Sequence, residues 1–187
     1  MEKYIIKQNT VYIHGIKIDD HIVHSEICEA GKEPFMVKSK PQEIMNQSCR
    51  FYGEHFNERK QFTKRLTNIT SKPPILVSPI ISTYFFCTNS ERTPENTWLN
   101  LLYVKEFLPL KGNKTKIILE KAPSIIFNIS KHVINHQYLN CTCLHYRNHR
   151  KNLFIRELNS VNLGLNQEGY NVLDVIDFYL NKNNYKK

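Results

Sequence analysis

Glycine is scarce in this chain of 187 residues, which contains only six. The sequence has no Walker loop, no GxGxxG motif and no GxSxG motif, so the common nucleotide-binding and serine-hydrolase signatures are missing. No run approaches the ~20 apolar residues of a membrane helix. These absences favour a binding protein over an enzyme, and we expect no catalytic residue, no cofactor and no membrane segment.

Disulfide bonds are also disfavoured. The five cysteines are an odd number, and the chain has no N-terminal apolar run of the kind that directs secretion. We therefore expect free thiols and a reducing, cytoplasmic location. Cys28, Cys49 and Cys87 stand among apolar neighbours, which is typical of buried packing residues.

Positive charge is abundant and unevenly distributed. The formal net charge is +9, and two blocks together supply slightly more than the whole of it. Residues 38–72 hold eight Lys and Arg against three Asp and Glu, and residues 131–156 hold five against none. A basic footprint gathered on part of the surface is typical of proteins that bind polyanions, nucleic acid above all.

The hydrophobic pattern predicts an α+β protein built on antiparallel strands. Short β-branched and aromatic runs separated by turn residues predict strands at 4–6, 11–18, 22–28, 35–38, 75–77, 84–87, 98–104, 116–119 and 125–127. Apolar residues at helical spacing predict a short helix near 41–52, a longer one near 129–149 and a C-terminal helix near 172–181. We expect one domain over residues 1–160, followed by a helical tail over residues 161–187.

The most informative stretch is Lys40 to Val77. Lys40-Pro41 is a typical helix start, because proline at the first helical position gives up an N–H that has no partner there, and Gly53 is expected to end the helix. Its apolar face turns Arg50 towards solvent or a partner. The loop expected after the glycine carries a cationic run of Arg59, Lys60, Lys64 and Arg65. We expect Trp98, the only tryptophan, in the core.

Three strings in this stretch resemble a known family. S-C-R-F-Y-G at 48–53, the pair Arg59-Lys60 and K-P-P-I-L-V at 72–77 are together similar to the ComK family, the competence transcription factors of Gram-positive bacteria. The likeness continues through Trp98 and V-K-E-F at 104–107, and it covers roughly residues 20–150.

The resemblance implies a transcription activator of competence genes. Such proteins bind paired AT-rich boxes in double-stranded DNA largely through the minor groove, as dimers that combine into a tetramer on the promoter. Family members are commonly delivered to a Clp protease by an adaptor that binds a hydrophobic C-terminal motif, from which the nearest string here, Leu153-Phe154-Ile155, departs.

Nine residues are candidates for DNA contact. Four match basic positions of the family pattern: Arg50, Arg59, Lys60 and Lys72. Five come from charge clustering in this chain alone: Lys64, Arg65, Arg147, Arg150 and Lys151.

Two other functions stay open at this point. Histidine and cysteine are zinc-ligand types, and the chain carries His132, His136, Cys141, Cys143, His145 and His149 close together, which would suit a zinc-dependent or zinc-stabilised nucleic-acid-processing enzyme. The C-x-C spacing is tighter than the usual zinc knuckle, and H-V-I-N-H at 132–136 lacks the glutamate of HEXXH, so we expect no metal. The third function is a protein-interaction module whose basic surface meets an acidic partner.

Overall fold

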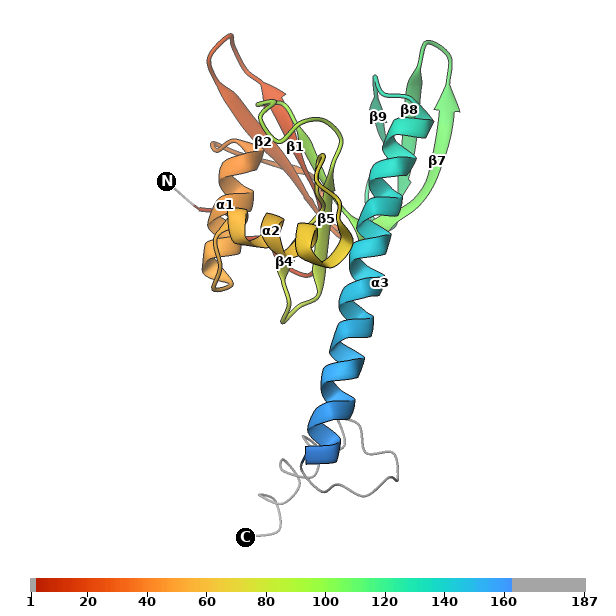
Figure 1. Ribbon diagram of the computed structural model, residues 1–187. Helices are drawn as coiled ribbons and strands as arrows, with labels where there is room; N and C mark the ends of the chain where they lie inside the picture. The colour runs from red at the N-terminus through yellow and green to blue at the C-terminus, as the bar shows by residue number, and fades with distance from the viewer. Residues whose placement is uncertain (1–2, 163–187) are drawn as a thin grey trace, which may run out of the picture. The chain divides into compact units, whose positions relative to one another are not determined.

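The computed structural model describes residues 3–162 (Figure 1). The chain separates into two compact units, residues 1–145 and residues 146–187. The helix predicted near 172–181 lies outside the described residues, and so does the tail predicted over 161–187 apart from its first two residues. No helix among the described residues combines the length and apolarity needed to cross a bilayer.

A six-stranded antiparallel sheet forms the centre of the first unit. Its strand order is β3-β2-β1-β6-β5-β4, with bounds Phe35–Val37, Val23–Glu29, Thr10–Lys17, Thr97–Asn100, Thr83–Cys87 and Ile75–Ser78. A second antiparallel sheet has the order β7-β8-β9, with bounds Val104–Leu110, Lys114–Leu119 and Ile125–Phe127. With the helices these sheets confirm the predicted α+β class.

Two strand predictions were wrong. Residues 4–6 form an irregular segment rather than a strand. Their apolar pattern reflects the burial of the Tyr4 and Ile6 side chains in the core. The run 98–104 is not one strand either. It breaks at a 3₁₀ turn, Leu101–Tyr103, whose start is capped by the Asn100 side chain accepting from Leu102 N–H at 3.2 Å. After this turn the chain leaves the first sheet and enters the second.

Three helices complete the described chain: α1 (Pro41–Phe51), α2 (Phe56–Thr67) and α3 (Lys131–Asn162). The short predicted helix is confirmed, with Pro41 in its first turn. The long predicted helix is confirmed and continues thirteen residues further. Helix α2 replaces the loop that was expected to carry Arg59 and Lys60. It was missed because three of its four buried residues, Arg59, Thr63 and Thr67, are polar, which interrupts the apolar stripe that usually identifies a helix.

Strands β4, β5 and β6 of the six-stranded sheet are buried on both faces. Successive residues of β4 and β5 alternate between two hydrophobic clusters, because side chains of a strand point to opposite faces. One cluster joins the sheet to α1 and α2 through Ile44, Met45, Cys49, Phe56, Ile75, Val77, Phe85 and Trp98. The other joins it to the second sheet and the first part of α3 through Leu76, Phe86, Leu99, Phe107, Ile117, Phe127, Ile134 and Leu144. Trp98 is fully buried and packs edge-on against the Phe56 ring, as predicted.

The two sheets carry the same structural unit twice (Figure 1). In the first, Ser25 pairs with Val37 and Ile27 with Phe35. In the second, Thr115 pairs with Phe127 and Ile117 with Ile125, so each pair recurs after 90 residues. The hairpins also share an irregularity, since the register shifts between Thr10 and Tyr12 in β1 and between Val104 and Glu106 in β7.

Side-chain details repeat as well. The Ser25 hydroxyl donates to the carbonyl of Ser39 at 2.7 Å, and the Thr115 hydroxyl donates to the carbonyl of Ile129 at the same distance. The turn after the hairpin holds Gly31 at φ 74° and Lys121 at φ 56°. Residues 23–51 and 113–141 share only three identical residues. The chain therefore contains an internal structural repeat, a hairpin with a third strand and a helix, which the sequence barely records.

A buried carboxylate anchors the N-terminal segment to the first hairpin. Glu29 is 2% exposed. Its oxygens accept from Lys7 Nζ at 2.9 Å, Lys32 Nζ at 2.7 Å and the Tyr4 hydroxyl at 3.1 Å. The bonds from Lys32 and Lys7 outweigh the effect of burial and lower the pKa of Glu29 to about 2.

We expect Glu29→Gln to lower the free energy of unfolding by about 2 kcal/mol at neutral pH, because the charge-assisted bonds are weakened. The depressed pKa makes this contribution complete above the unfolded value near 4.5 and lost as pH falls through about 2. Denaturant unfolding measured from pH 7 down to acid should therefore show a smaller loss of stability for the variant. Glu33→Gln, an exposed carboxylate four residues further along the chain, is the control. Equal pH dependence in Glu29→Gln and the unmodified protein would contradict the assignment.

Candidate nucleic-acid interface

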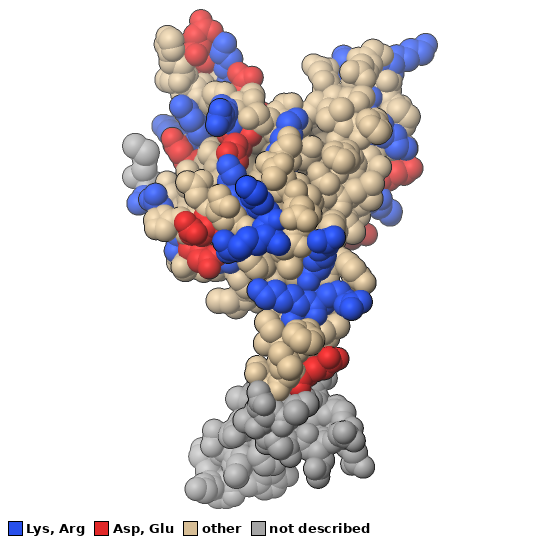
Figure 2. All heavy atoms as spheres, in the orientation of Figure 1, with Lys and Arg blue, Asp and Glu red and all other residues tan. Residues whose placement is uncertain are grey.

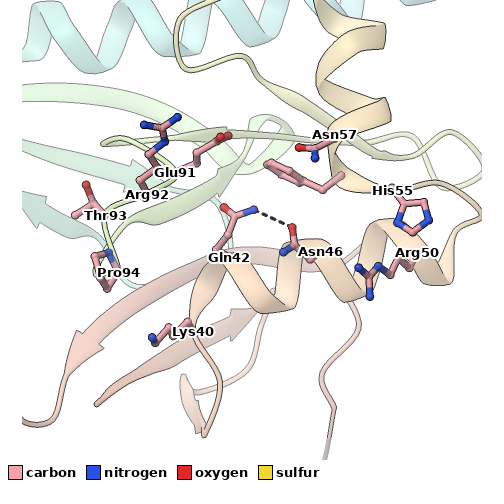
Figure 3. A pocket seen from close by; sticks show the side chains of 11 residues that line it. Lys40, Gln42, Asn46, Arg50, His55, Asn57, Glu91, Arg92, Thr93 and Pro94 are labelled. Carbon is pink, nitrogen blue, oxygen red and sulfur yellow. Dashed lines mark hydrogen bonds between the residues drawn. The ribbon is translucent and has the colours of Figure 1, made fainter. Parts of the chain in front are cut away.

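An open groove of about 430 Å³ lies between α1, the start of α2 and the loop that joins β5 to β6 (Figure 3). Most of its lining is polar or cationic, and the residues are Lys40, Gln42, Asn46, Arg50, His55, Phe56, Asn57, Glu91, Arg92, Thr93 and Pro94. The hydrophobic cluster beneath α1 and α2 holds both helices against the sheet, so the walls of the groove are fixed by the core.

One face of α1 supplies a row of three side chains to this groove. Gln42, Asn46 and Arg50 follow one another at intervals of four residues, which places them on one side of a helix. The Gln42 Nε2 donates to Asn46 Oδ1 at 3.0 Å, which occupies the acceptor of Asn46 and leaves its amino group as a donor. Arg50 is exposed. The prediction that α1 turns Arg50 outward is confirmed.

The groove also contains two cations that were not among the nine candidates for DNA contact. Lys40 precedes α1 and Arg92 lies in the β5–β6 loop, and both are exposed. Arg92 was missed because Glu91 and Glu95 stand beside it in the sequence, so that the charge of its segment is low. The fold places it across the groove from α1.

The Arg59-Lys60 pair is held by carboxylates within the first unit. Arg59 is 5% exposed. Its Nη1 lies 3.0 Å from Glu54 Oε2, and its Nη2 donates to the Tyr52 carbonyl at 3.3 Å. These bonds join α2 to the end of α1. Lys60 forms an ion pair with Glu91 of the β5–β6 loop, and its Nζ lies 5.8 Å from the centre of the Phe56 ring.

The last turn of α2 presents cations to solvent. Lys64 and Arg65 are exposed there, and Figure 2 shows lysine and arginine side chains gathered over this helix. Lys72 follows α2 and is half-buried at φ 45°. Burial raises the pKa of Cys87 in β5 to about 12, and the positive charge of Lys72 acts in the opposite direction. The Lys72 side chain therefore lies near this strand of the sheet.

The second unit contributes the remaining three candidates. Arg147, Arg150 and Lys151 are exposed on α3, at intervals of three and four residues that place them on one face. The Arg150 guanidinium donates to the Tyr146 hydroxyl at 3.3 Å. This part of α3 thus presents a cationic face of its own.

The cysteines and histidines do not assemble a metal site within residues 3–162, where no three His, Cys, Asp or Glu side chains are grouped for one ion. Cys28, Cys49, Cys87 and Cys141 are buried free thiols, and the burial predicted for the first three is confirmed. Desolvation raises the pKa of Cys49 to about 12 and that of Cys141 well above its ordinary value. Buried thiols of this kind resist the deprotonation that zinc binding requires.

Comparison with known proteins adds two matches. The family model described as "ComK protein" matches residues 1–152. The competence transcription factor of Bacillus subtilis (strain 168) is 31% identical over 137 residues, which are 73% of this chain and 70% of that protein. No solved structure matches the chain.

Because Arg59 is paired within the first unit, its substitution should change the stability of the fold without changing DNA binding. We expect Arg59→Met to lower the free energy of unfolding by roughly 1–3 kcal/mol, because a charged hydrogen bond between α1 and α2 is lost. We expect the salt dependence of DNA binding to stay unchanged, since the guanidinium is turned inward. Thermal unfolding and binding titrations over a range of salt measure the two effects, with exposed Lys64→Met as the control. Unchanged stability together with a reduced salt slope would move Arg59 into the interface.

Proposed function

The chain belongs to the ComK family, and from this premise we propose that it is a transcription factor that binds double-stranded DNA. The family model covers the whole of the first unit and reaches into the second. The net charge of +9 supports a nucleic-acid partner, because neutralising phosphates releases the counterions condensed on DNA. We further propose that it acts in the cytoplasm as an activator of competence genes.

The groove beside α1 is the element that we propose reads DNA sequence. The minor groove at A·T pairs presents only acceptors, N3 of adenine and O2 of thymine. Asn46 and Arg50 supply donors along one helix face, and the bond from Gln42 to the Asn46 carbonyl oxygen leaves the Asn46 amino group as a donor. Narrow AT-rich minor grooves are also strongly negative and attract arginine. This donor row supports recognition of AT-rich boxes through the minor groove, and it is the observation that carries the proposal.

Phosphate contacts are proposed for the exposed cations. Lys64 and Arg65 end α2 in the first unit, and Arg147, Arg150 and Lys151 form the cationic face of α3. Such contacts position a protein on the duplex without reading its sequence. We propose that Arg59, Lys60 and Lys72 support the fold of the first unit rather than contact DNA, because the first two are paired with carboxylates and the third is half-buried.

Assembly on the promoter as a dimer of dimers belongs to the same proposal. Apolar side chains on α3 support a subunit contact, since Phe154 and Leu158 lie one turn apart and are 59% and 48% exposed. The neighbouring string Leu153-Phe154-Ile155 is also the segment that we propose for an adaptor that delivers the chain to a Clp protease. Both partners would use exposed apolar residues of one helix.

A salt titration tests the function. In a gel shift we expect the protein to bind a fragment with paired AT-rich boxes more tightly than a GC-rich fragment of equal length. Lys64→Gln/Arg65→Gln should weaken binding to both fragments and reduce the slope of log K against log salt by about 0.9 per lost phosphate contact. Glu33→Gln serves as an exposed control. Equal affinity for the two fragments would refute sequence selectivity, and indifference to DNA at low salt would favour an acidic protein partner.

The role of α1 is tested separately by Asn46→Ala. Loss of a donor that reads base edges should cost roughly 1–3 kcal/mol of discrimination, so the ratio of the affinities for the AT-rich and GC-rich fragments should fall about tenfold. The salt slope should stay unchanged, since no phosphate contact is removed. Gln47→Ala, on the same helix outside the groove lining, is the matched control. An equal fall in affinity for both fragments would assign Asn46 to general binding.

A further inference from the structure

The two repeated hairpins have nearly the same backbone and opposite charge. Residues 10–29, which form β1 and β2, contain one lysine and four acidic residues. Residues 104–119, which form β7 and β8, contain four lysines and one acidic residue. Figure 2 shows acidic side chains at the tip of the first hairpin and lysines at the tip of the second. The fold does not require this difference in charge, because both hairpins have the same strand pairing.

The tip of the β7–β8 hairpin is short and fully exposed. Leu110 pairs with Lys114, which leaves a loop of only three residues between the strands. Gly112 and Asn113 adopt positive φ values of 73° and 58°, the backbone conformation that closes a tight turn and that glycine and asparagine tolerate best. Lys111, Asn113 and Lys114 are exposed. The turn therefore presents two lysines on a constrained scaffold.

The lysines of this tip differ from their counterpart in the first hairpin. Lys17 and Lys111 occupy equivalent positions of the two repeats, and Lys17 lies 2.7 Å from the carboxylate of Asp20. Among the described residues no carboxylate forms an ion pair with Lys111 or Lys114. Their charge is available to a partner, whereas that of Lys17 is neutralised within its own hairpin.

We propose that the tip of the β7–β8 hairpin is a second DNA-contacting element, in which Lys111 and Lys114 bind backbone phosphates. The inference rests on the proposed function and adds a contact outside the α1 groove and outside both basic blocks of the sequence. Lysines on a rigid turn lose less conformational freedom on binding than lysines on a mobile segment. The acidic first hairpin stays away from DNA, because Asp19 and Asp20 would be repelled by phosphates.

The first experiment measures the salt dependence of DNA binding by the full chain. Lys111→Gln/Lys114→Gln should reduce the slope of log K against log salt by about 1.8, or 0.9 per phosphate contact. The control, Lys3→Gln/Lys17→Gln, removes the same charge from exposed positions outside both basic blocks and outside the groove lining and should leave the slope unchanged. Equal slopes for the two variants would overturn the inference, because the charge would then act without regard to position. Thermal unfolding checks that both variants are folded.

A second experiment identifies what the tip touches. A photo-crosslinking amino acid is introduced at Lys111 and, separately, at the equivalent Lys17, and each protein is irradiated on an AT-rich promoter fragment. We expect a DNA adduct from position 111 and none from position 17. An adduct from position 111 to a second protein chain in place of DNA would overturn the inference, since the basic tip would then meet the acidic hairpin of another copy.

The two proposals fail in different ways. If the unmodified protein does not bind DNA at low salt, the proposed function fails, and the hairpin contact fails with it. If the unmodified protein binds with a steep salt slope, but the Lys111→Gln/Lys114→Gln variant keeps that slope and position 111 gives no DNA adduct, only the hairpin contact is refuted.

Discussion

Burial of strands β4, β5 and β6 on both faces is the constraint on which the rest of the first unit depends. Phe85 and Trp98 face α1 and α2, while Phe86 and Leu99, one residue along each strand, face the second sheet and the first part of α3. Because the side-chain period of a strand is two, a slip of one residue would exchange the two clusters. Both helices and the second sheet are therefore positioned by a single register. Gly15 shows how tight this arrangement is, since a Cβ there would lie 2.6 Å from the Glu95 backbone.

The proposed reading groove is a consequence of that packing. Helix α1 buries Ile44, Met45 and Cys49, which leaves its opposite side for the donor row. The ion pairs of Arg59 with Glu54 and of Lys60 with Glu91 join α2 to its neighbours, so these cations shape the groove instead of projecting from it. A basic pair in the sequence can thus stabilise the fold, while exposed cations nearby are available for contact with DNA.

The internal repeat shows how one backbone plan accommodates different surfaces. The register, the bulge and the hydroxyl bond to the chain after the third strand recur in both copies, because they are set by backbone pairing and by residues that face inward. The exposed residues obey no such requirement. One hairpin is acidic and contains the buried Glu29, while at the position equivalent to Glu29 the other has Leu119 within the hydrophobic core. Surface charge is free to diverge, and the basic hairpin is the copy suited to a polyanion.

The sequence alone determined the elements with strong local signals. Proline placed the start of α1, β-branched and aromatic runs placed most strands, and the apolar setting of Cys28, Cys49 and Cys87 predicted their burial, because these features act over a few residues. Helix α2 was not predicted, since most of its buried residues are threonine and arginine. The tertiary structure alone decided which cations are paired and which are exposed, placed Arg92 beside α1 and revealed the repeat. Those outcomes depend on contacts between residues far apart in the chain, such as Lys60 with Glu91, and no local pattern encodes them.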